Sequence, residues 1–269
     1  MSSNSYVEFG SSNKIVVMKS ANKIYFLFFS ILLMSFVFQP TKKIQIWLIG
    51  DSTVCYYGPE RAPITGWGMP FSWFFDSTVQ TNNRARGGRS TRTFINENRW
   101  QPIADSLQEG DYVLMQFGHN DEAKEEKYKD RYTSPDDYRK NLIKFITETK
   151  AKKANPIVIT PVSRMRFDTT GKALETHKEY SEIAIAVAIE MNIPFIDLDK
   201  ESRKLLQELG PQASKLLFLQ LAPGEHPFYP AGIKDNTHFS ELGARKMACI
   251  VLAGIKEQQL ALAKYIIVK

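Results

Sequence analysis

Short apolar segments alternate with longer segments of helical periodicity along most of this chain, and this alternation limits its fold more than any other feature. The apolar segments lie at 46–49, 111–117, 156–160 and 194–198, with a further short strand predicted at 79–83. Nearly continuous apolar runs of this length are typical of parallel strands that are buried on both faces. The order predicts an α/β protein, a three-layer α/β/α sandwich built on a parallel, flavodoxin-like sheet.

Three helices are predicted between or after these strands. Ser134 can cap a helix whose first turn contains Pro135 and two aspartates, and apolar residues then recur at helical spacing. A second helix is expected over 174–191. Ser240 is expected to cap a third helix that starts at Glu241. The helix that begins after Ser134 is expected to be structural.

Composition excludes several classes of protein. The chain has 269 residues, of which 43% are hydrophobic and 24% charged, as in folded globular proteins. Its formal net charge of +6 is small, and it has no Lys/Arg run interleaved with aromatic residues, so we expect no nucleic-acid partner. Cys55 and Cys249 are not in a metal-binding spacing; we expect two free, mostly buried thiols, with one long-range disulfide as the alternative.

The N-terminal segment is typical of an export signal. A basic stretch beginning at Met18 leads into an apolar run over 24–38 that is too short for a comfortable membrane span. No clear cleavage site follows, so an uncleaved anchor is the alternative. We therefore predict an export signal or N-terminal anchor at 1–40, one folded domain at 41–269, and a periplasmic or extracellular location.

A candidate nucleophile follows the first apolar strand. Gly50, Asp51 and Ser52 form a small polar turn directly after it. A serine hydroxyl is a weak nucleophile unless a base is held against it and hydrogen-bond donors await the oxyanion. Taken alone, the tripeptide also fits a simple strand-ending turn, so the assignment depends on partners elsewhere in the chain.

Three later segments can supply those partners. Glycines at 87–88 follow the strand predicted at 79–83, and the polar residues at 118–121 follow the buried strand at 111–117, where an open α/β sheet forms its site. Asp235 precedes His238 by three residues in a predicted loop before the last helix. An aspartate at this spacing can accept the Nδ1 proton of the imidazole and leave Nε2 free to act as a base toward a serine.

These four segments together resemble the SGNH (GDSL-type) hydrolases. Within that family the chain is most similar to the rhamnogalacturonan acetylesterases, through Gly-Asp-Ser-Thr at 50–53, Gly-Trp-Gly at 66–68, Gly-Gly-Arg-Ser at 87–90 and Phe-Gly-His-Asn-Asp at 117–121. The resemblance implies that Ser52 attacks an acetyl carbonyl, that His238 is the general base and then the general acid, and that Asp235 orients His238. It covers nearly the whole chain after residue 44.

The same resemblance implies an oxyanion hole and a set of pocket residues. The backbone N–H groups of Ser52 and Gly88 and the side-chain amide of Asn120 would hold the oxyanion, with Gly87 as the alternative to Gly88. Four further residues are expected to bind substrate or line its pocket: Trp67, Arg89, His119 and His226. For Trp67 the alternative is a place in the core, and for Arg89 it is a surface salt bridge. Asp51 and Asp121 are expected to be structural, bonding backbone groups of the two loops.

The sequence thus predicts a serine esterase that removes acetyl groups from plant cell-wall polysaccharide, with pectic rhamnogalacturonan as the expected substrate. An acetylxylan or other acyl-sugar esterase and an inactive carbohydrate-binding relative remain as alternatives. A nucleotide-binding protein with the same order of elements is disfavoured because no Gly-rich phosphate loop opens the first helix. We expect no metal or other cofactor, no stable membrane partner beyond the N-terminal segment, and a monomer.

Overall fold

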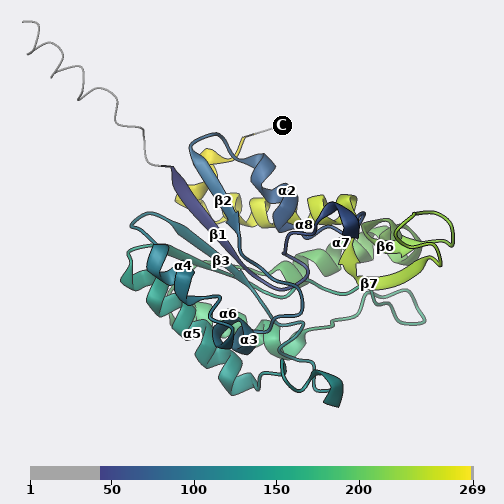
Figure 1. The fold of residues 1–269 in the computed structure, drawn as a ribbon, viewed down its shortest axis with the longest axis horizontal. Helices are drawn as coiled ribbons and strands as arrows, with labels where there is room; N and C mark the ends of the chain where they lie inside the picture. The colour runs from purple at the N-terminus through teal and green to yellow at the C-terminus, as the bar shows by residue number, and fades with distance from the viewer. Residues whose placement is uncertain (1–42, 268–269) are drawn as a thin grey trace, which may run out of the picture. The chain divides into compact units, whose positions relative to one another are not determined.

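A five-stranded parallel sheet forms the centre of the structure (Figure 1). The computed structural model describes residues 43–267, so the predicted export segment lies outside the described residues. The strands are β1 (Ile44–Gly50), β2 (Val79–Asn83), β3 (Tyr112–Gln116), β4 (Asn155–Ile159) and β5 (Phe195–Ile196). All pairs are parallel, and the order β2-β1-β3-β4-β5 is the predicted flavodoxin-like order.

Helices cover both faces of this sheet, as the alternating pattern predicts. The α-helices of the described part are α2 (Gly68–Phe71), α3 (Thr91–Asn96), α4 (Gln101–Ser106), α5 (Pro135–Ala151), α6 (Lys178–Glu190), α7 (Leu198–Ala213) and α8 (Glu241–Glu257). Successive side chains of a strand point to opposite faces. Ile46 and Leu48 of β1 therefore belong to one core with α2, α7 and α8, whereas Trp47 and Ile49 belong to a second core with α3 to α6.

The helix caps behave as predicted. The hydroxyl of Ser134 accepts a hydrogen bond from the backbone N–H of Asp137 at the start of α5. The hydroxyl of Ser240 accepts one from Gly243 at the start of α8. Both helices therefore begin at the residue that the sequence indicates.

Two predicted boundaries on the later part of the chain are wrong. The helix expected over 174–191 begins only at Lys178. The hydroxyl of Thr176 accepts a hydrogen bond from the backbone N–H of Arg164, so this segment is held in an irregular conformation before the helix. The strand expected over 194–198 is limited to Phe195–Ile196. It ends because Asp197 caps α7, a helix that the sequence analysis did not predict.

A small antiparallel sheet also lies outside the predicted pattern. It pairs β6 (Phe218–Leu221) with β7 (Ile233–Phe239), and β7 contains the whole segment from Asp235 to His238. The prediction that His238 lies in a loop is therefore wrong. Backbone pairing with β6, reinforced by Gln220, which donates to the carbonyl of Asp235 at 2.9 Å, turns this segment into a strand end.

Both cysteines are free thiols, as predicted, but they differ in exposure. Cys55 is buried beside the nucleophile turn, whereas Cys249 is exposed on α8, which corrects the expectation of two mostly buried thiols. The apolar run around Cys249 is amphipathic, so its neighbours Ala248 and Val251 face the core while the thiol faces outward. Within 43–267, no helix is long and apolar enough to cross a membrane.

Candidate active site

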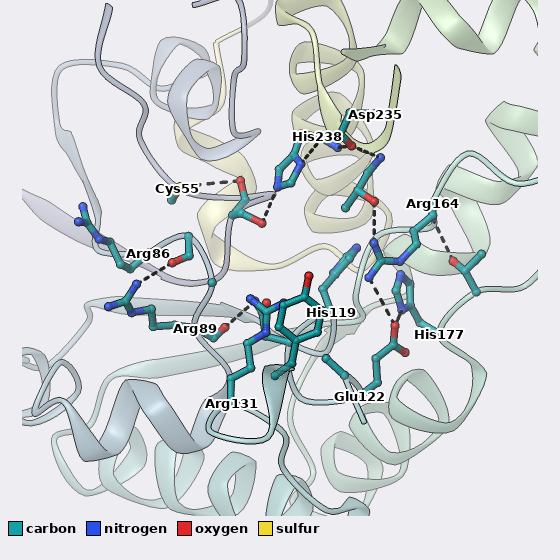
Figure 2. Close-up of a pocket in the computed structure, with 18 of the residues that line it drawn as sticks. Cys55, Arg86, Arg89, His119, Glu122, Arg131, Arg164, His177, Asp235 and His238 are labelled. Atoms are coloured by element: carbon teal, nitrogen blue, oxygen red, sulfur yellow. Dashed lines mark hydrogen bonds and ion pairs between the residues drawn. The ribbon is translucent and has the colours of Figure 1, made fainter. Parts of the chain in front are cut away.

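A groove of about 1350 Å³ lies across the carboxyl ends of β1 and β3 and is lined by Ser52 and His238 (Figure 2). The nucleophile turn after β1, the glycines after β2, and the loop after β3 all contribute to it. The end of β7 supplies the other wall. The groove therefore forms where parallel strand ends meet, which is where open α/β sheets bind ligands.

Ser52, His238 and Asp235 form one hydrogen-bonded row. The hydroxyl of Ser52 lies 2.9 Å from Nε2 of His238, and Nδ1 of His238 lies 2.7 Å from Oδ2 of Asp235. The other carboxylate oxygen of Asp235 accepts hydrogen bonds from the backbone N–H groups of Thr237 and His238, at 2.8 and 3.0 Å. The structure thus brings together three residues that the sequence analysis had connected only by spacing and resemblance.

The charge of Asp235 follows from these contacts. Burial by itself raises the pKa of this carboxyl, but the hydrogen bond and charge of His238 outweigh it, and the pKa falls to about 2. Asp235 is therefore ionised at neutral pH and can only accept a hydrogen bond, which the Nδ1–H of a neutral imidazole donates. In that tautomer the lone pair of Nε2 faces the Ser52 hydroxyl.

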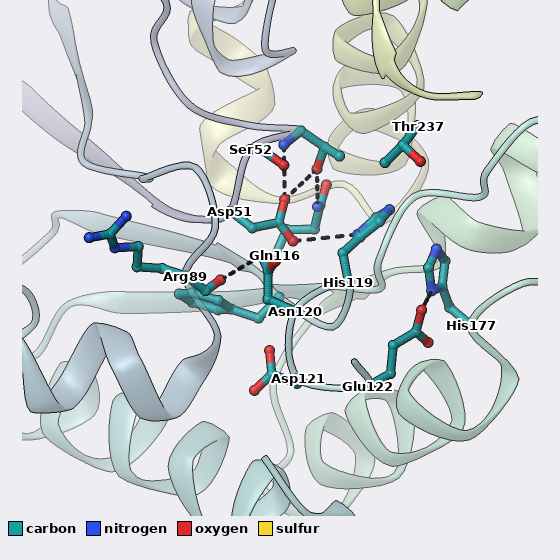
Figure 3. Close-up of polar contacts among 12 residues, drawn as sticks. Asp51, Ser52, Arg89, Gln116, His119, Asn120, Asp121, Glu122, His177 and Thr237 are labelled. Carbon is teal, nitrogen blue, oxygen red and sulfur yellow. Dashed lines mark hydrogen bonds and ion pairs between the residues drawn. The ribbon is translucent and has the colours of Figure 1, made fainter. Parts of the chain in front are cut away.

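A chain of buried hydrogen bonds holds the nucleophile turn. Oδ1 of Asp51 accepts from the backbone N–H and the hydroxyl of Thr53, at 2.9 and 2.8 Å. The Thr53 hydroxyl accepts from the Gln116 side-chain amide at 2.7 Å, so the turn is tied to the end of β3 (Figure 3). On the outer side, the Tyr57 hydroxyl donates to the carbonyl of Ser52 at 2.9 Å. Asp51 therefore has the structural role that was predicted for it.

The prediction that Trp67 lines the pocket is wrong. Its side chain is only 1% exposed, and its indole Nε1 donates to the Gln116 side chain at 2.7 Å. A Cβ on Gly66 would lie 2.1 Å from the Cys55 carbonyl oxygen, and one on Gly68 would lie 2.6 Å from the carbonyl oxygen of Val54. The two glycines thus allow this turn to pack closely against the backbone of the nucleophile loop. In this position the indole points inward, away from the groove.

The residues expected to form an oxyanion hole all line the groove. Gly88 has a φ of +79°, a conformation that favours glycine, and a Cβ on Gly87 would lie 3.6 Å from the Cβ of Ser52. The Asn120 amide donates one hydrogen bond to the carbonyl of Arg89 at 3.0 Å (Figure 3). An amide nitrogen has two donors, so this contact orients Asn120 and leaves a second N–H for a ligand.

His119 lies in the groove wall, as predicted. It is 5% exposed, and its Nδ1 lies 3.4 Å from Oδ2 of Asp51. Burial and the neighbouring charge of His177 lower the pKa of His119 to about 4, so the ring is neutral at pH 7. Asp121 is fully buried, and its Oδ1 accepts from the backbone N–H and the hydroxyl of Thr91, which confirms its structural role.

The other two predicted pocket residues do not point at substrate. Arg89 lines the groove, but its guanidinium is engaged by Glu97 at 3.0 Å and by the carbonyl of Gly87 at 2.9 Å, the salt bridge that was the alternative. His226 does not line the groove at all. It lies in the segment between β6 and β7, where its Nδ1 accepts from the backbone of Phe228 at 3.3 Å, and the expectation that it forms part of the pocket wall is wrong.

Sequence reasoning missed a cluster beside His238. Arg164 donates to the hydroxyl of Thr237 at 2.6 Å and lies 3.6 Å from Glu122, which also contacts Nδ1 of His177 at 2.9 Å (Figure 2). Glu122 directly follows the polar motif at 118–121, so its position after a strand was a usable signal. Arg164 follows the strand predicted at 156–160 without a polar motif to mark it, and His177 was expected inside a helix, so only the tertiary structure brings these two residues to the groove.

Comparison with known proteins places the chain in a family. The sequence model of the GDSL-like lipase/acylhydrolase family matches residues 48–246. The chain belongs to this family. It is 43% identical over 227 residues to the rhamnogalacturonan acetylesterase RhgT of Bacillus subtilis strain 168, covering 84% of this chain and 95% of RhgT. It is 36% identical over 225 residues to YesY of the same organism, a probable rhamnogalacturonan acetylesterase, covering 83% and 97%.

Similar solved structures confirm the fold prediction. The crystal structure of YxiM from Bacillus subtilis matches with a TM-score of 0.70 at 29% identity, covering 83% of this chain and 59% of that one. The acetylxylan esterase Axe2 from Geobacillus stearothermophilus matches with a TM-score of 0.57 at 20% identity, covering 81% and 96%. The resemblance to SGNH (GDSL-type) hydrolases that the motifs indicated is thus confirmed, and the fold is the α/β fold of that family.

Proposed function

We propose that this protein is a serine esterase that removes acetyl groups from polysaccharide, with pectic rhamnogalacturonan as its substrate. The observation that carries the proposal is the row from Ser52 through His238 to Asp235, with separations of 2.9 and 2.7 Å, at the wall of an open groove. The names of RhgT and YesY support the choice of substrate. Acetylxylan is the alternative, and the experiment below separates the two.

The chemistry follows from the contacts of each residue. As the Ser52 hydroxyl attacks the acetyl carbonyl, Nε2 of His238 takes its proton, and ionised Asp235 stabilises the imidazolium that results. The protonated His238 then gives its proton to the departing sugar oxygen, which leaves an acetyl-enzyme. Water attacks that ester with His238 again as base, and acetate is released with the free serine hydroxyl. These reaction steps need no metal or other cofactor.

The oxyanion of each tetrahedral intermediate needs fixed donors. The backbone N–H groups of Ser52 and Gly88 and the second N–H of Asn120 would supply them. Asn120 is held by the Arg89 carbonyl before substrate arrives, so it does not have to reorganise during the reaction. Loss of one such donor typically lowers kcat by about 100-fold or more.

The groove is suited to an acidic, hydrated polymer. Its walls are mainly polar, and basic side chains outnumber acidic ones among the lining residues. A lipid acyl chain would instead need an apolar wall. We further propose that the protein acts as a monomer outside the cytoplasm, with the segment at 1–40 as export signal or anchor, since such a polymer is met outside the cell.

The decisive experiment measures acetate released from a panel of acetylated polysaccharides. Wild-type protein is expected to act best on rhamnogalacturonan, and Ser52→Ala is expected to release none while keeping the wild-type melting temperature. Full activity in Ser52→Ala would end the esterase proposal, and preference for acetylxylan would end the substrate assignment. Asn120→Ala should lower kcat far more than it raises KM, and the opposite pattern would remove Asn120 from the oxyanion hole.

An inactive binding protein with the same fold is tested separately. A serine-directed organophosphate should label wild-type protein rapidly and leave Ser52→Ala unlabelled, because only a serine activated by His238 reacts at neutral pH. Absence of labelling, together with retained binding to the polysaccharide, would favour the binding protein.

A further inference from the structure

Arg131 carries a charge that no other side chain of the described chain neutralises. Its guanidinium lies over the Tyr128 ring, with Cζ 3.7 Å from the ring centroid. Within residues 43–267 it forms no ion pair, and its buried Nε finds no hydrogen-bond acceptor. The positive charge of Arg131 therefore has no counterion in the unliganded protein, and an anion bound at its terminal nitrogens would supply one.

The other arginines nearest to the nucleophile are not available in this way. Arg89 is paired with Glu97, and Arg164 is engaged by Glu122 and the hydroxyl of Thr237. Figure 2 shows the side chains of Arg86 and Arg89 directed away from the row of catalytic candidates. In the same view the side chain of Arg131, which lines the groove, extends from the opposite side toward that row of residues.

Arg131 also lies beside the proposed oxyanion hole. A Cβ built on Gly88 would lie 3.7 Å from Nη1 of Arg131, and no other heavy atom of residues 43–267 outside 87–89 lies within 4 Å of that point. An anion held by the terminal nitrogens of Arg131 would therefore lie close to the ester carbonyl. Such an anion would be a charged group on the acetylated sugar ring or on its neighbour in the chain.

The loop that carries Arg131 is fixed before substrate binds. The backbone N–H of Arg131 donates to the carbonyl of Tyr128 at 3.0 Å, and that of Thr133 donates to the carbonyl of Asp121 at 3.0 Å. Arg92 of α3 donates to the carbonyls of Lys129, at 2.7 Å, and of Asp130. A preorganised guanidinium loses little side-chain freedom on binding, so more of the contact energy is realised as affinity.

We infer that Arg131, supported by the Tyr128 ring, is a binding site for the carboxylate of a uronic acid residue in the substrate. The planar guanidinium offers two parallel N–H donors to a carboxylate, a geometry that a neutral sugar hydroxyl cannot match. The site would distinguish an acidic glycan from a neutral one. This inference deepens the proposed function. It rests on that function only in taking acetylated rhamnogalacturonan as the substrate.

The first test compares one substrate in two charge states. Wild type and Arg131→Gln are assayed for acetate release from an acetylated rhamnogalacturonan oligosaccharide and from the same oligosaccharide with its carboxyl groups reduced to alcohols. The ratio of wild-type to variant kcat/KM is expected to be about tenfold larger on the acidic form, mainly through KM. Arg131→Lys keeps the charge but loses the two parallel N–H donors of the guanidinium. Its kcat/KM on the acidic form should therefore lie between those of wild type and Arg131→Gln. Equal ratios on both forms would overturn the inference.

Arg245→Gln is the matched control. Arg245 also packs on an aromatic ring, 4.5 Å from the centroid of Trp73, but it lies on α8 outside the groove. Its loss removes the same formal charge and the same kind of stacking contact, together with an exposed ion pair to Glu241 at 2.7 Å. We expect it to leave the ratio between acidic and reduced substrates at the wild-type value. An equal effect of both variants would mean that net charge alone steers the polymer, which would also overturn the site.

A second measurement does not depend on the proposed substrate. Unacetylated oligogalacturonate is used to inhibit hydrolysis of 4-nitrophenyl acetate by wild type and by Arg131→Gln. Inhibition should be about tenfold weaker in the variant, and a neutral xylo-oligosaccharide of the same length should show no such difference. If wild type fails on acetylated rhamnogalacturonan but this difference persists, the proposed substrate is wrong and the carboxylate site stands. Equal inhibition of both proteins would refute the site.

Discussion

Replacement of Trp67 by phenylalanine tests how the nucleophile turn is supported. The indole Nε1 donates to Oε1 of Gln116 at 2.7 Å, and the amide of Gln116 in turn donates to the Thr53 hydroxyl at 2.7 Å. All three side chains are at most 1% exposed. Phenylalanine keeps most of the buried ring but removes the donor, so the Gln116 oxygen is left without its partner in a site that water does not reach.

The size of the effect follows from that isolation. Leaving one buried acceptor unsatisfied costs about 1–3 kcal/mol. In a domain of this length each kcal/mol lowers the melting temperature by about 2–4 °C. We therefore expect Trp67→Phe to lower the free energy of unfolding by about 2 kcal/mol. KM for an acetylated oligosaccharide should stay near the wild-type value, since Trp67 does not line the groove.

Thermal and urea unfolding, measured beside steady-state kinetics, check this expectation. Trp73→Phe is the control, because the Trp73 side chain is 44% exposed and its change should alter stability by less than about 0.5 kcal/mol. The reasoning would be refuted if Trp67→Phe unfolded like wild type while its KM rose several-fold. That result would put the indole in contact with substrate, as the sequence alone suggested.

Three further predictions concern other parts of the domain. Gly88→Ala should lower stability by about 1–2 kcal/mol because φ is +79°, whereas Gly87→Ala, whose Cβ would meet only ordinary contacts, should not; urea midpoints in the reverse order would contradict this. Burial raises the pKa of Asp121 to about 7 from 3.8, so the folded state binds a proton that the unfolded chain has lost. The free energy of unfolding should then fall as the pH rises from about 4 to 7. Asp121→Asn should weaken this dependence of stability on pH, measured by urea titrations at several pH values. Ellman's reagent should titrate Cys249 in the native protein and reach buried Cys55, whose pKa is raised by burial, only after unfolding; two fast thiols would contradict the fold around the nucleophile turn.

Local sequence patterns were sufficient for the sheet and for the row of three residues. Strands β1, β3 and β4 are recognisable because each is a short apolar run buried on both faces. Helix α5 is recognisable because Ser134 caps it directly before Pro135. The polar segments after β1 and β3 could be selected because the carboxyl ends of parallel strands meet at one edge, and the resemblance to the SGNH hydrolases then singled out Ser52 and Asn120 within them. His238 and Asp235 could be paired because three residues of spacing allow their contact.

Only the tertiary structure decided which way the remaining side chains point. Trp67 faces inward because its hydrogen-bond partner, Gln116, comes from a strand 49 residues away. His238 lies on a strand because β6, a distant segment of weak pattern, pairs with it. Arg131 faces the groove because Arg92 and Tyr128 hold its loop there. Such orientations depend on contacts between segments far apart in the sequence, so no local pattern of apolar and polar residues contains them.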